Sequence, residues 1–326
     1  MIVSKTPFRI TLGGGGTDLP SYYNNYGGFI FSFCLSKYMY VCVNRPSADN
    51  LIRLKYSISE TVENIEDLKH DIARTCLKRL KIDSKIEIAS LSDIPAGSGL
   101  GSSSTYTVGL LNSLHSLKGE KRSLESLANE ACIVEMDILK KPMGKQDQYL
   151  AALGGFVVLE IDKKGNVNSK HIHLNEGRIK SLKKNLLIFY TGKQRLNKGI
   201  LEEQDKSTKL KKTDVLNSLH YIKESGYKIL EIVESGDLDK LGFMFKEHWE
   251  MKKKLSSGVT NKYFDSIYSE AISNGATGGK ISGAGGGGFF TFYCPNGHQK
   301  LRKKMKDMGL YELDFNFDFS GSQIIS

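Results

Sequence analysis

Residues 95–104 read Pro95-Ala-Gly-Ser-Gly-Leu-Gly-Ser-Ser-Ser104, and they lead directly into a helix-like segment at 105–117. Three alternating glycines let a ligand approach the backbone closely, and the amides at the start of a helix attract phosphate. The serine hydroxyls can donate hydrogen bonds or ligate a cation. The stretch therefore predicts a binding loop for the phosphates of a nucleotide. Its expected contacts are Pro95, Gly97, Ser98, Gly99, Leu100, Gly101, Ser102, Ser103 and Ser104.

This loop differs from the two common phosphate-binding motifs. It lacks the Lys-Ser or Lys-Thr ending of the usual phosphate loop, and it does not fit Gly-x-Gly-x-x-Gly. The competing interpretation is a flexible Gly/Ser turn before a core helix.

The length of 326 residues, 40% of them hydrophobic, is enough for two domains with substantial cores. We place the boundary in the polar, basic stretch 162–184, giving domains at 1–178 and 179–326. The five cysteines are odd in number and widely spaced, so neither a disulfide framework nor a zinc site is expected. With no apolar stretch resembling a signal peptide or a membrane span, the sequence predicts a cytoplasmic, soluble protein.

The net charge of +10 is spread along the chain. The densest basic stretch, 206–212, carries no interleaved aromatic residues and resembles one solvated face of a helix. No nucleic-acid-reading motif accompanies the charge, so small anionic substrates are expected as partners, without nucleic acid or membrane. His171 and His173 have no carboxylate or cysteine beside them, and a solvated strand edge is favoured over a metal site. The sequence does not predict an oligomeric state.

The hydrophobic patterns predict a mixture of strands and helices. Strands are expected at 29–43, 155–161, 186–190 and 313–319, and amphipathic helices at 68–80, 104–117, 123–139, 214–235, 237–255 and 260–274.

Two further glycine clusters lie at 13–16 and 283–288, each after a strand-like segment. Three such clusters in one globular chain predict tight turns around a single polyanionic ligand. In the last cluster, Gly285 and Gly286 are the expected nucleotide contacts.

The three glycine segments together resemble the motifs of the GHMP kinases, the superfamily of galactokinase, homoserine kinase, mevalonate kinase and phosphomevalonate kinase. Residues 95–104 are similar to its second motif, Pro-x-x-x-Gly-Leu-Gly-Ser-Ser-Ala, with Ser104 in place of the final Ala. Lys280-Ile-Ser-Gly-Ala-Gly-Gly-Gly-Gly288 resembles the third motif, and Pro7-Phe-Arg-Ile-Thr-Leu-Gly-Gly-Gly-Gly-Thr-Asp18 the first.

Within the superfamily, the sequence resembles the bacterial D-glycero-D-manno-heptose 7-phosphate kinases. The shared features are the glycines before Thr17-Asp18, the segment Gly144-Lys-Gln-Asp-Gln-Tyr149, and the strand end Tyr190-Thr-Gly-x-x-Arg195. Gly15 and Gly16 replace the Glu-His of galactokinase, which argues against galactose as the substrate.

The resemblance implies an α+β protein with a ribosomal-protein-S5-type N-terminal domain, a ferredoxin-like C-terminal domain, and ATP and sugar between them. It implies ATP- and magnesium-dependent phosphorylation of the anomeric C1 hydroxyl of D-glycero-D-manno-heptose 7-phosphate. The product would be the α-1,7-bisphosphate, used in nucleotide-activated heptose synthesis for bacterial surface polysaccharide.

The resemblance also implies the catalytic groups. Asp147 is the candidate base, and Arg9 could lower the hydroxyl pKa and stabilise the transition state. Ser103 and Glu135 are the candidate magnesium ligands, with Glu130 as the local competitor. From spacing alone, Asp147 could equally be an ordinary helix-start aspartate.

For the acceptor, the resemblance assigns the sugar to Asp18 with Thr17 and Gly16 beside it, and Gly27 and Gly28 would allow close approach of the ring. A turn aspartate is the alternative for Asp18. The acceptor phosphate is assigned to Lys193 and Arg195, although Lys145 and Lys198 are equally plausible.

Two rival functions remain compatible with these residues. An anomeric kinase of another sugar, such as fucose, would keep Asp147 and Asp18 but would have no use for a basic phosphate site. A non-catalytic relative would bind ATP and sugar without turnover. A dinucleotide-binding oxidoreductase fits less well, because the first glycine run lacks the required spacing.

Overall fold

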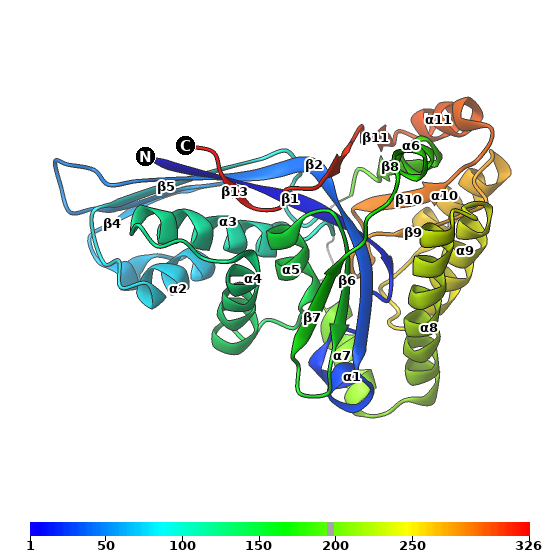
Figure 1. The fold of residues 1–326 in the computed structure, drawn as a ribbon, viewed down its shortest axis with the longest axis horizontal. Coiled ribbons are helices and arrows are strands. Elements are labelled where there is room, and N and C mark those ends of the chain that lie inside the picture. The colour runs from blue at the N-terminus through cyan, green and yellow to red at the C-terminus, as the bar shows by residue number, and fades with distance from the viewer. Residues whose placement is uncertain (194–198) are drawn as a thin grey trace.

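The computed structural model describes residues 1–193 and 199–326, which form two β-sheets with helices packed against them (Figure 1). The first sheet contains β1 (Ile2–Gly13), β2 (Gly28–Asn44), β3 (Ile52–Lys55), β4 (Ser59–Val62), β5 (Ile86–Ser92), β6 (Phe156–Ile161), β7 (Val167–His171), β12 (Phe317–Asp318) and β13 (Gln323–Ile324). The second contains β8 (Leu186–Tyr190), β9 (Gly278–Ile281), β10 (Phe289–Tyr293) and β11 (Tyr311–Glu312).

The helices differ widely in length. They are α1 (Pro20–Tyr26), α2 (Asp71–Arg79), α3 (Ser102–Leu117), α4 (Leu124–Cys132), α5 (Gln146–Leu153), α6 (Glu176–Asn185), α7 (Ile200–Lys209), α8 (Thr213–Ser235), α9 (Asp239–Lys253), α10 (Lys262–Ser273) and α11 (His298–Asp307). A 3-10 turn covers Ile65–Asp67, and a π-helix, Ile133–Ile138, continues α4.

The long strand β2 organises the first sheet. It pairs antiparallel with β1 along most of its length, with β6 at Gly28 to Phe33 and with β5 at Met39 to Asn44. Its first eight residues are all buried, which explains the unbroken apolar pattern. The strand expected at 29–43 is therefore present as one continuous strand.

Helix α3 lies against β1 and β2 and carries the core of the first sheet, with α2, α4 and α5 packed around it (Figure 1). Gly109 permits this close packing, because a Cβ there would lie 2.9 Å from Thr6 Oγ1. Packing against β1 therefore fixes the position of the first turn of α3, which follows the 95–104 loop. A phosphate-binding element at that point sits on a fixed support.

The second sheet is covered by α9 and α10, and α8 packs alongside α9 (Figure 1). Trp249 of α9 is fully buried and meets Phe290 of β10 edge-on. The structure thus has the mixed α+β architecture that the sequence analysis predicted. The expected helices at 214–235, 237–255 and 260–274 correspond to α8, α9 and α10.

The end of the chain differs from the expectation of a half-buried strand at 313–319. Only the two-residue strand β12 forms there, and it pairs with β2, while β13 pairs with β1. Phe315 packs against Phe33 of β2. The chain therefore returns to the first sheet after β11, the last strand of the second sheet. The domain boundary expected near residue 178 falls inside α6.

None of the helices in the described ranges is long and apolar enough to cross a membrane. All five cysteines are free, and four of them are buried.

Candidate active site

A cavity of about 420 Å³ is lined by residues from both halves of the chain. Each of the three glycine segments contributes, through Gly16, Gly101 and Gly283 among others. The second and third segments touch, because a Cβ on Gly99 would lie 2.7 Å from the Ser282 carbonyl oxygen. The three clusters thus surround one space, as their common composition predicts.

The 95–104 loop presents a strongly curved backbone to this cavity. Gly97, Gly99 and Gly101 have φ angles of 72°, 77° and 88°, a left-handed conformation that favours glycine. Gly101 is also the N-cap of α3, so the unpaired amides of the first turn follow it. Such alternating curvature exposes successive N–H groups toward an anion.

The loop residues divide into two groups. Those lining the cavity are Gly97, Gly99, Gly101, Ser102, Ser103 and Ser104. Pro95 is exposed, whereas Ser98 and Leu100 are fully buried and belong to the support of the loop rather than its lining. The Ser102 hydroxyl is buried without a hydrogen-bond partner among the described residues, which leaves it available to a bound oxygen.

Ser103 and Glu135 meet at the start of α3. The Ser103 hydroxyl donates to Glu135 Oε1 (2.5 Å), and Gln148 Nε2 donates to Oε2 (2.8 Å). Glu135 is fully buried in the π-helix, and burial raises its pKa while the hydrogen bond from Ser103 opposes the rise. No described basic side chain forms an ion pair with it.

A buried carboxylate beside a hydroxyl, without a basic partner, fits a hard divalent cation. Among the described residues there is no cluster of three or more His, Cys, Asp or Glu side chains that could hold a metal alone. This suits magnesium, which commonly takes one or two protein ligands and completes its shell with phosphate and water. Glu130, the competing candidate, instead binds Arg79 Nε (2.7 Å) and His115 Nε2 (2.8 Å).

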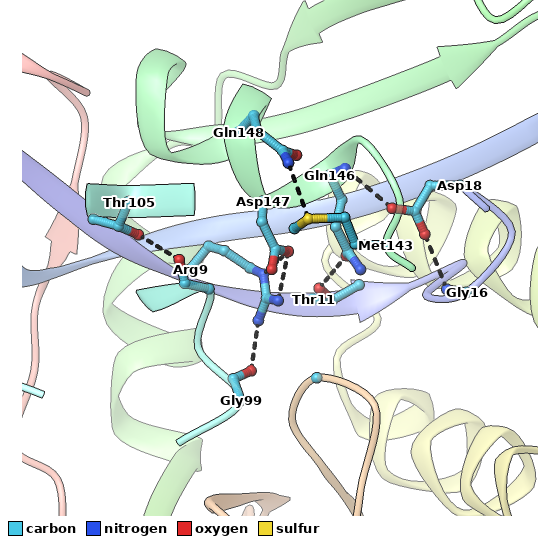
Figure 2. Close-up of polar contacts among 12 residues, drawn as sticks. Arg9, Thr11, Gly16, Asp18, Gly99, Thr105, Met143, Gln146, Asp147 and Gln148 are labelled. Carbon is cyan, nitrogen blue, oxygen red and sulfur yellow. Dashed lines mark hydrogen bonds and ion pairs between the residues drawn. The ribbon is translucent and has the colours of Figure 1, made fainter. Parts of the chain in front are cut away.

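Arg9 of β1 and Asp147 of α5 form the central ion pair (Figure 2). Arg9 donates from Nε (2.8 Å) and Nη2 (2.5 Å) to Asp147 Oδ1, and from Nη1 to the Gly99 carbonyl (2.8 Å). Asp147 Oδ2 accepts no hydrogen bond from any described residue. A Cβ placed on Gly101 would lie 3.3 Å from Oδ2, so this oxygen faces the 95–104 loop.

Asp18 lies beside this pair and lines the same cavity (Figure 2). The amides of Gly16 (3.2 Å) and Gln146 (3.0 Å) donate to its two oxygens. Burial raises its pKa from 3.8 to about 6; the amide of Gln146 opposes this rise and the charge of Asp147 adds to it. Asp18 is thus a buried acceptor next to the candidate base rather than a solvated turn residue.

Several other residues expected at the substrate lie elsewhere. The Thr17 hydroxyl is buried between the carbonyls of Gly14 and Phe29, and Gly27 and Gly28 do not line the cavity. Gly27 has a φ of 68° at the end of α1, and Gly28 packs against the Thr17 carbonyl, so a turn and a close contact account for them.

The basic residues and the glycines of the third segment that were expected to contact the ligands do not line the cavity in the described part of the chain. Lys193 is exposed with its ammonium 4.4 Å from the centre of the Tyr263 ring, outside the cavity lining. Lys145 donates to the Gly165 carbonyl (2.5 Å). Arg195 and Lys198 lie outside the described residues. Gly285 and Gly286 face Val259, and Gly283 with Ala284 lines the cavity instead.

Sequence reasoning missed several cavity residues, among them Gln204, His248, Lys252 and Lys280. Gln204 of α7 is nearly buried and donates to the Gly16 carbonyl (3.2 Å). No role at the site was assigned from the sequence to His248 of α9 or to Lys280, which opens the segment that resembles the third motif. For the two lysines and His248, the available signal was a basic residue inside an apolar pattern, which occurs on many helices and strands.

Family models match both halves of the chain. Residues 67–155 match the GHMP kinases N terminal domain, and residues 229–308 match the GHMP kinases C terminal domain. The D-glycero-alpha-D-manno-heptose 7-phosphate kinase of Campylobacter jejuni is 32% identical over 98% of this chain and 97% of its own length. The chain therefore belongs to the GHMP kinase family, and it is a sugar kinase.

Solved structures share the fold. A D-glycero-D-manno-heptose 1-phosphate kinase from Bacteroides thetaiotaomicron superposes with a TM-score of 0.83 at 23% identity, covering 100% of this chain and 99% of that one. Lactococcus lactis galactokinase complexed with galactose superposes with a TM-score of 0.77 at 19% identity, covering 99% and 94%.

Proposed function

We propose that this sugar kinase transfers the γ-phosphoryl group of ATP to the anomeric C1 hydroxyl of D-glycero-D-manno-heptose 7-phosphate, giving the α-1,7-bisphosphate. The observation that carries the substrate assignment is the similarity to the Campylobacter jejuni heptose 7-phosphate kinase along nearly the whole of both chains. The geometry around Arg9 and Asp147 supports the type of chemistry. The product would enter nucleotide-activated heptose synthesis for bacterial surface polysaccharide.

The donor phosphates would lie against the 95–104 loop. Its curved backbone and the start of α3 supply N–H groups, and the Ser102 hydroxyl supplies another donor. Ser103 and Glu135 would hold magnesium, which neutralises charge on the β- and γ-phosphates. Catalysis of phosphoryl transfer rests largely on such positioning and charge stabilisation.

Asp147 would accept the proton of the C1 hydroxyl as its oxygen attacks the γ-phosphorus and the bond to the β-phosphate oxygen breaks, releasing ADP. Both Arg9 hydrogen bonds to the carboxylate end on Oδ1, so Oδ2 is left to receive the proton. Arg9 also holds the Gly99 carbonyl, which ties the base to the phosphate loop. The guanidinium therefore orients the base and brings positive charge to the transferring group.

Asp18 would accept hydrogen bonds from sugar hydroxyls. Its two amide contacts fix the carboxylate, and Gly144 leaves room for it, because a Cβ there would lie 1.9 Å from Asp18 Oδ2. A preorganised acceptor can distinguish sugars by the direction of a hydroxyl.

Another sugar kinase activity is the main alternative. L-fucokinase/L-fucose-1-P guanylyltransferase of Bacteroides fragilis is 26% identical over 93% of this chain and 36% of its own length. Fucose carries no phosphate, so a fucokinase has no need of a second anion site in the cavity.

The test is ATP consumption with magnesium against a panel of D-glycero-D-manno-heptose 7-phosphate, mannose, fucose, galactose and mevalonate, with products located by phosphorus NMR. An anomeric phosphate formed only on the heptose phosphate is the expected result. Turnover of fucose in its place would establish the alternative. No turnover of any acceptor, despite binding of ATP and sugar, would identify a non-catalytic relative.

A further inference from the structure

Two buried lysines and a histidine form one wall of the cavity. Lys252 and His248 come from α9, and Lys280 comes from β9. Their side chains are 8%, 1% and 3% exposed respectively. A lysine buried as deeply as Lys280 usually has a partner of opposite charge or a functional reason. This basic wall, defined as His248, Lys252 and Lys280, is not used by the phosphate loop or by the Arg9–Asp147 pair.

Backbone carbonyls fix the two ammonium groups. Lys280 Nζ donates to the carbonyl of Leu12, and Lys252 Nζ donates to the carbonyls of Ile281 (2.8 Å) and Gly283. Leu12 immediately precedes the first glycine segment, which leads to Asp18. The lysines are therefore anchored where the first and third glycine segments meet, with little freedom to move away from the cavity.

Among the described residues, no carboxylate forms an ion pair with Lys280. Burial lowers the pKa of Lys280 well below its usual range, and the neighbouring Lys252 lowers it further. Burial and the same two lysines also lower the pKa of His248. A bound anion would favour the charged forms of these groups and would offset the cost of burying them.

We propose that Lys252 and Lys280, with His248 beside them, bind the phosphate group of the acceptor. This inference rests on the proposed function, since only a phosphorylated acceptor brings a second phosphate to the cavity. The donor already has a separate cradle at the start of α3. Lys280 donates a hydrogen bond to the carbonyl of Leu12 in β1, and the chain continues from β1 to Asp18, the candidate for sugar binding.

The basic residues first expected in this role are less well placed within the described ranges. Lys193 lies over Tyr263 outside the cavity lining, and Lys145 is directed to the Gly165 carbonyl. A buried, anchored ammonium loses little side-chain entropy on binding an anion, whereas an exposed lysine must be ordered first.

The test compares Lys252→Met and Lys280→Met with the exposed control Lys193→Met. Methionine keeps the side chain apart from its terminal ammonium group, and thermal unfolding of each variant checks that it folds. We expect kcat/KM for heptose 7-phosphate to fall about 10- to 100-fold, the value of a charge-assisted hydrogen bond. The same ratio for unphosphorylated heptose, and KM for ATP, should change less than about threefold. Equal loss on both acceptors, or a raised KM for ATP alone, would overturn the proposal.

A binding measurement separates this inference from the proposed function. Calorimetry without nucleotide would compare mannose 6-phosphate with mannose on the wild-type protein and on Lys280→Met. We expect the wild type to bind the phosphorylated sugar more tightly, and the variant to lose that preference. If the wild type prefers mannose 6-phosphate but fails to phosphorylate heptose 7-phosphate, only the proposed substrate is wrong. If the wild type shows no preference for the phosphorylated sugar, the basic wall is not an acceptor-phosphate site.

Discussion

Arg9 directs two hydrogen bonds to the same oxygen of Asp147, Oδ1, with its Nη2 atom 2.5 Å away, and leaves Oδ2 facing Gly101 at the start of α3. An arginine that donated hydrogen bonds to both carboxylate oxygens would leave neither oxygen free to accept a proton. The observed pairing fixes the orientation of the carboxylate while one oxygen stays available. The arrangement matches a base that must act next to a phosphate loop.

The first prediction concerns Asp147→Asn. The amide cannot accept the proton, so kcat should fall by about 100-fold or more, while KM for both substrates changes little. Steady-state kinetics on the acceptor identified by the panel measures both. Asp137→Asn, at an exposed aspartate, is the matched control and should keep wild-type kcat. A kcat near that of the wild type in Asp147→Asn would remove Asp147 from the mechanism.

The second prediction separates Glu135 from Glu130. Glu135→Gln should raise the magnesium concentration needed for half-maximal activity by about tenfold or more, because an anionic ligand is lost. Glu130→Gln should leave that concentration unchanged and lower the melting temperature, since it weakens contacts to Arg79 and His115. Titration of magnesium against activity, with thermal unfolding of each variant, makes the comparison. The opposite pattern would reassign the cation to Glu130.

The third prediction follows from the raised pKa of Asp18. Its value of about 6 in the folded protein, against 3.8 ordinarily, means that the folded state holds the proton more tightly. Ionisation of Asp18 therefore lowers the free energy of unfolding progressively as pH rises from about 4 to 6. Above pH 6 the free energy of unfolding stays at this lower level. Asp18→Asn removes this dependence. Relative to the wild type, its unfolding free energy should rise by about 2 kcal/mol between pH 4.5 and 7.5.

Denaturant unfolding at both pH values measures this difference, and any constant cost of the substitution cancels. Activity at pH 7.5 should fall in Asp18→Asn even though its relative stability rises. A constant stability difference between the two pH values would show that burial does not raise the pKa of Asp18.

The fourth prediction uses Gly144→Ala. The added methyl group would fall 1.9 Å from Asp18 Oδ2, so the carboxylate has to move. We expect KM for the acceptor to rise about tenfold or more while KM for ATP is unchanged. In Gly177→Ala, where the nearest atom is Asn175 Oδ1 at 3.4 Å, kinetics should stay at wild-type values. An unchanged acceptor KM in Gly144→Ala would argue that Asp18 does not contact the sugar.

The local chemistry of the chain predicted much of the candidate site. The alternating glycines of the 95–104 loop have the left-handed backbone their composition favours, and the loop opens a helix as expected. The long amphipathic helices α8, α9 and α10 were also predictable, because their periodicity extends over many residues. Short elements such as β12 and β13 were not, since two residues carry no periodic signal.

The sequence by itself determined the glycine-rich 95–104 loop, the glycine turns and the family resemblance, because these depend on residue types at short, fixed spacings. Only the tertiary structure decided which charged side chains share the cavity. Glu135 reaches Ser103 whereas Glu130 binds Arg79, although the two glutamates are on consecutive helical turns. Lys252 and Lys280 meet through the packing of α9 on β9. Such meetings depend on the direction of each side chain and on contacts between distant segments, which local patterns do not encode.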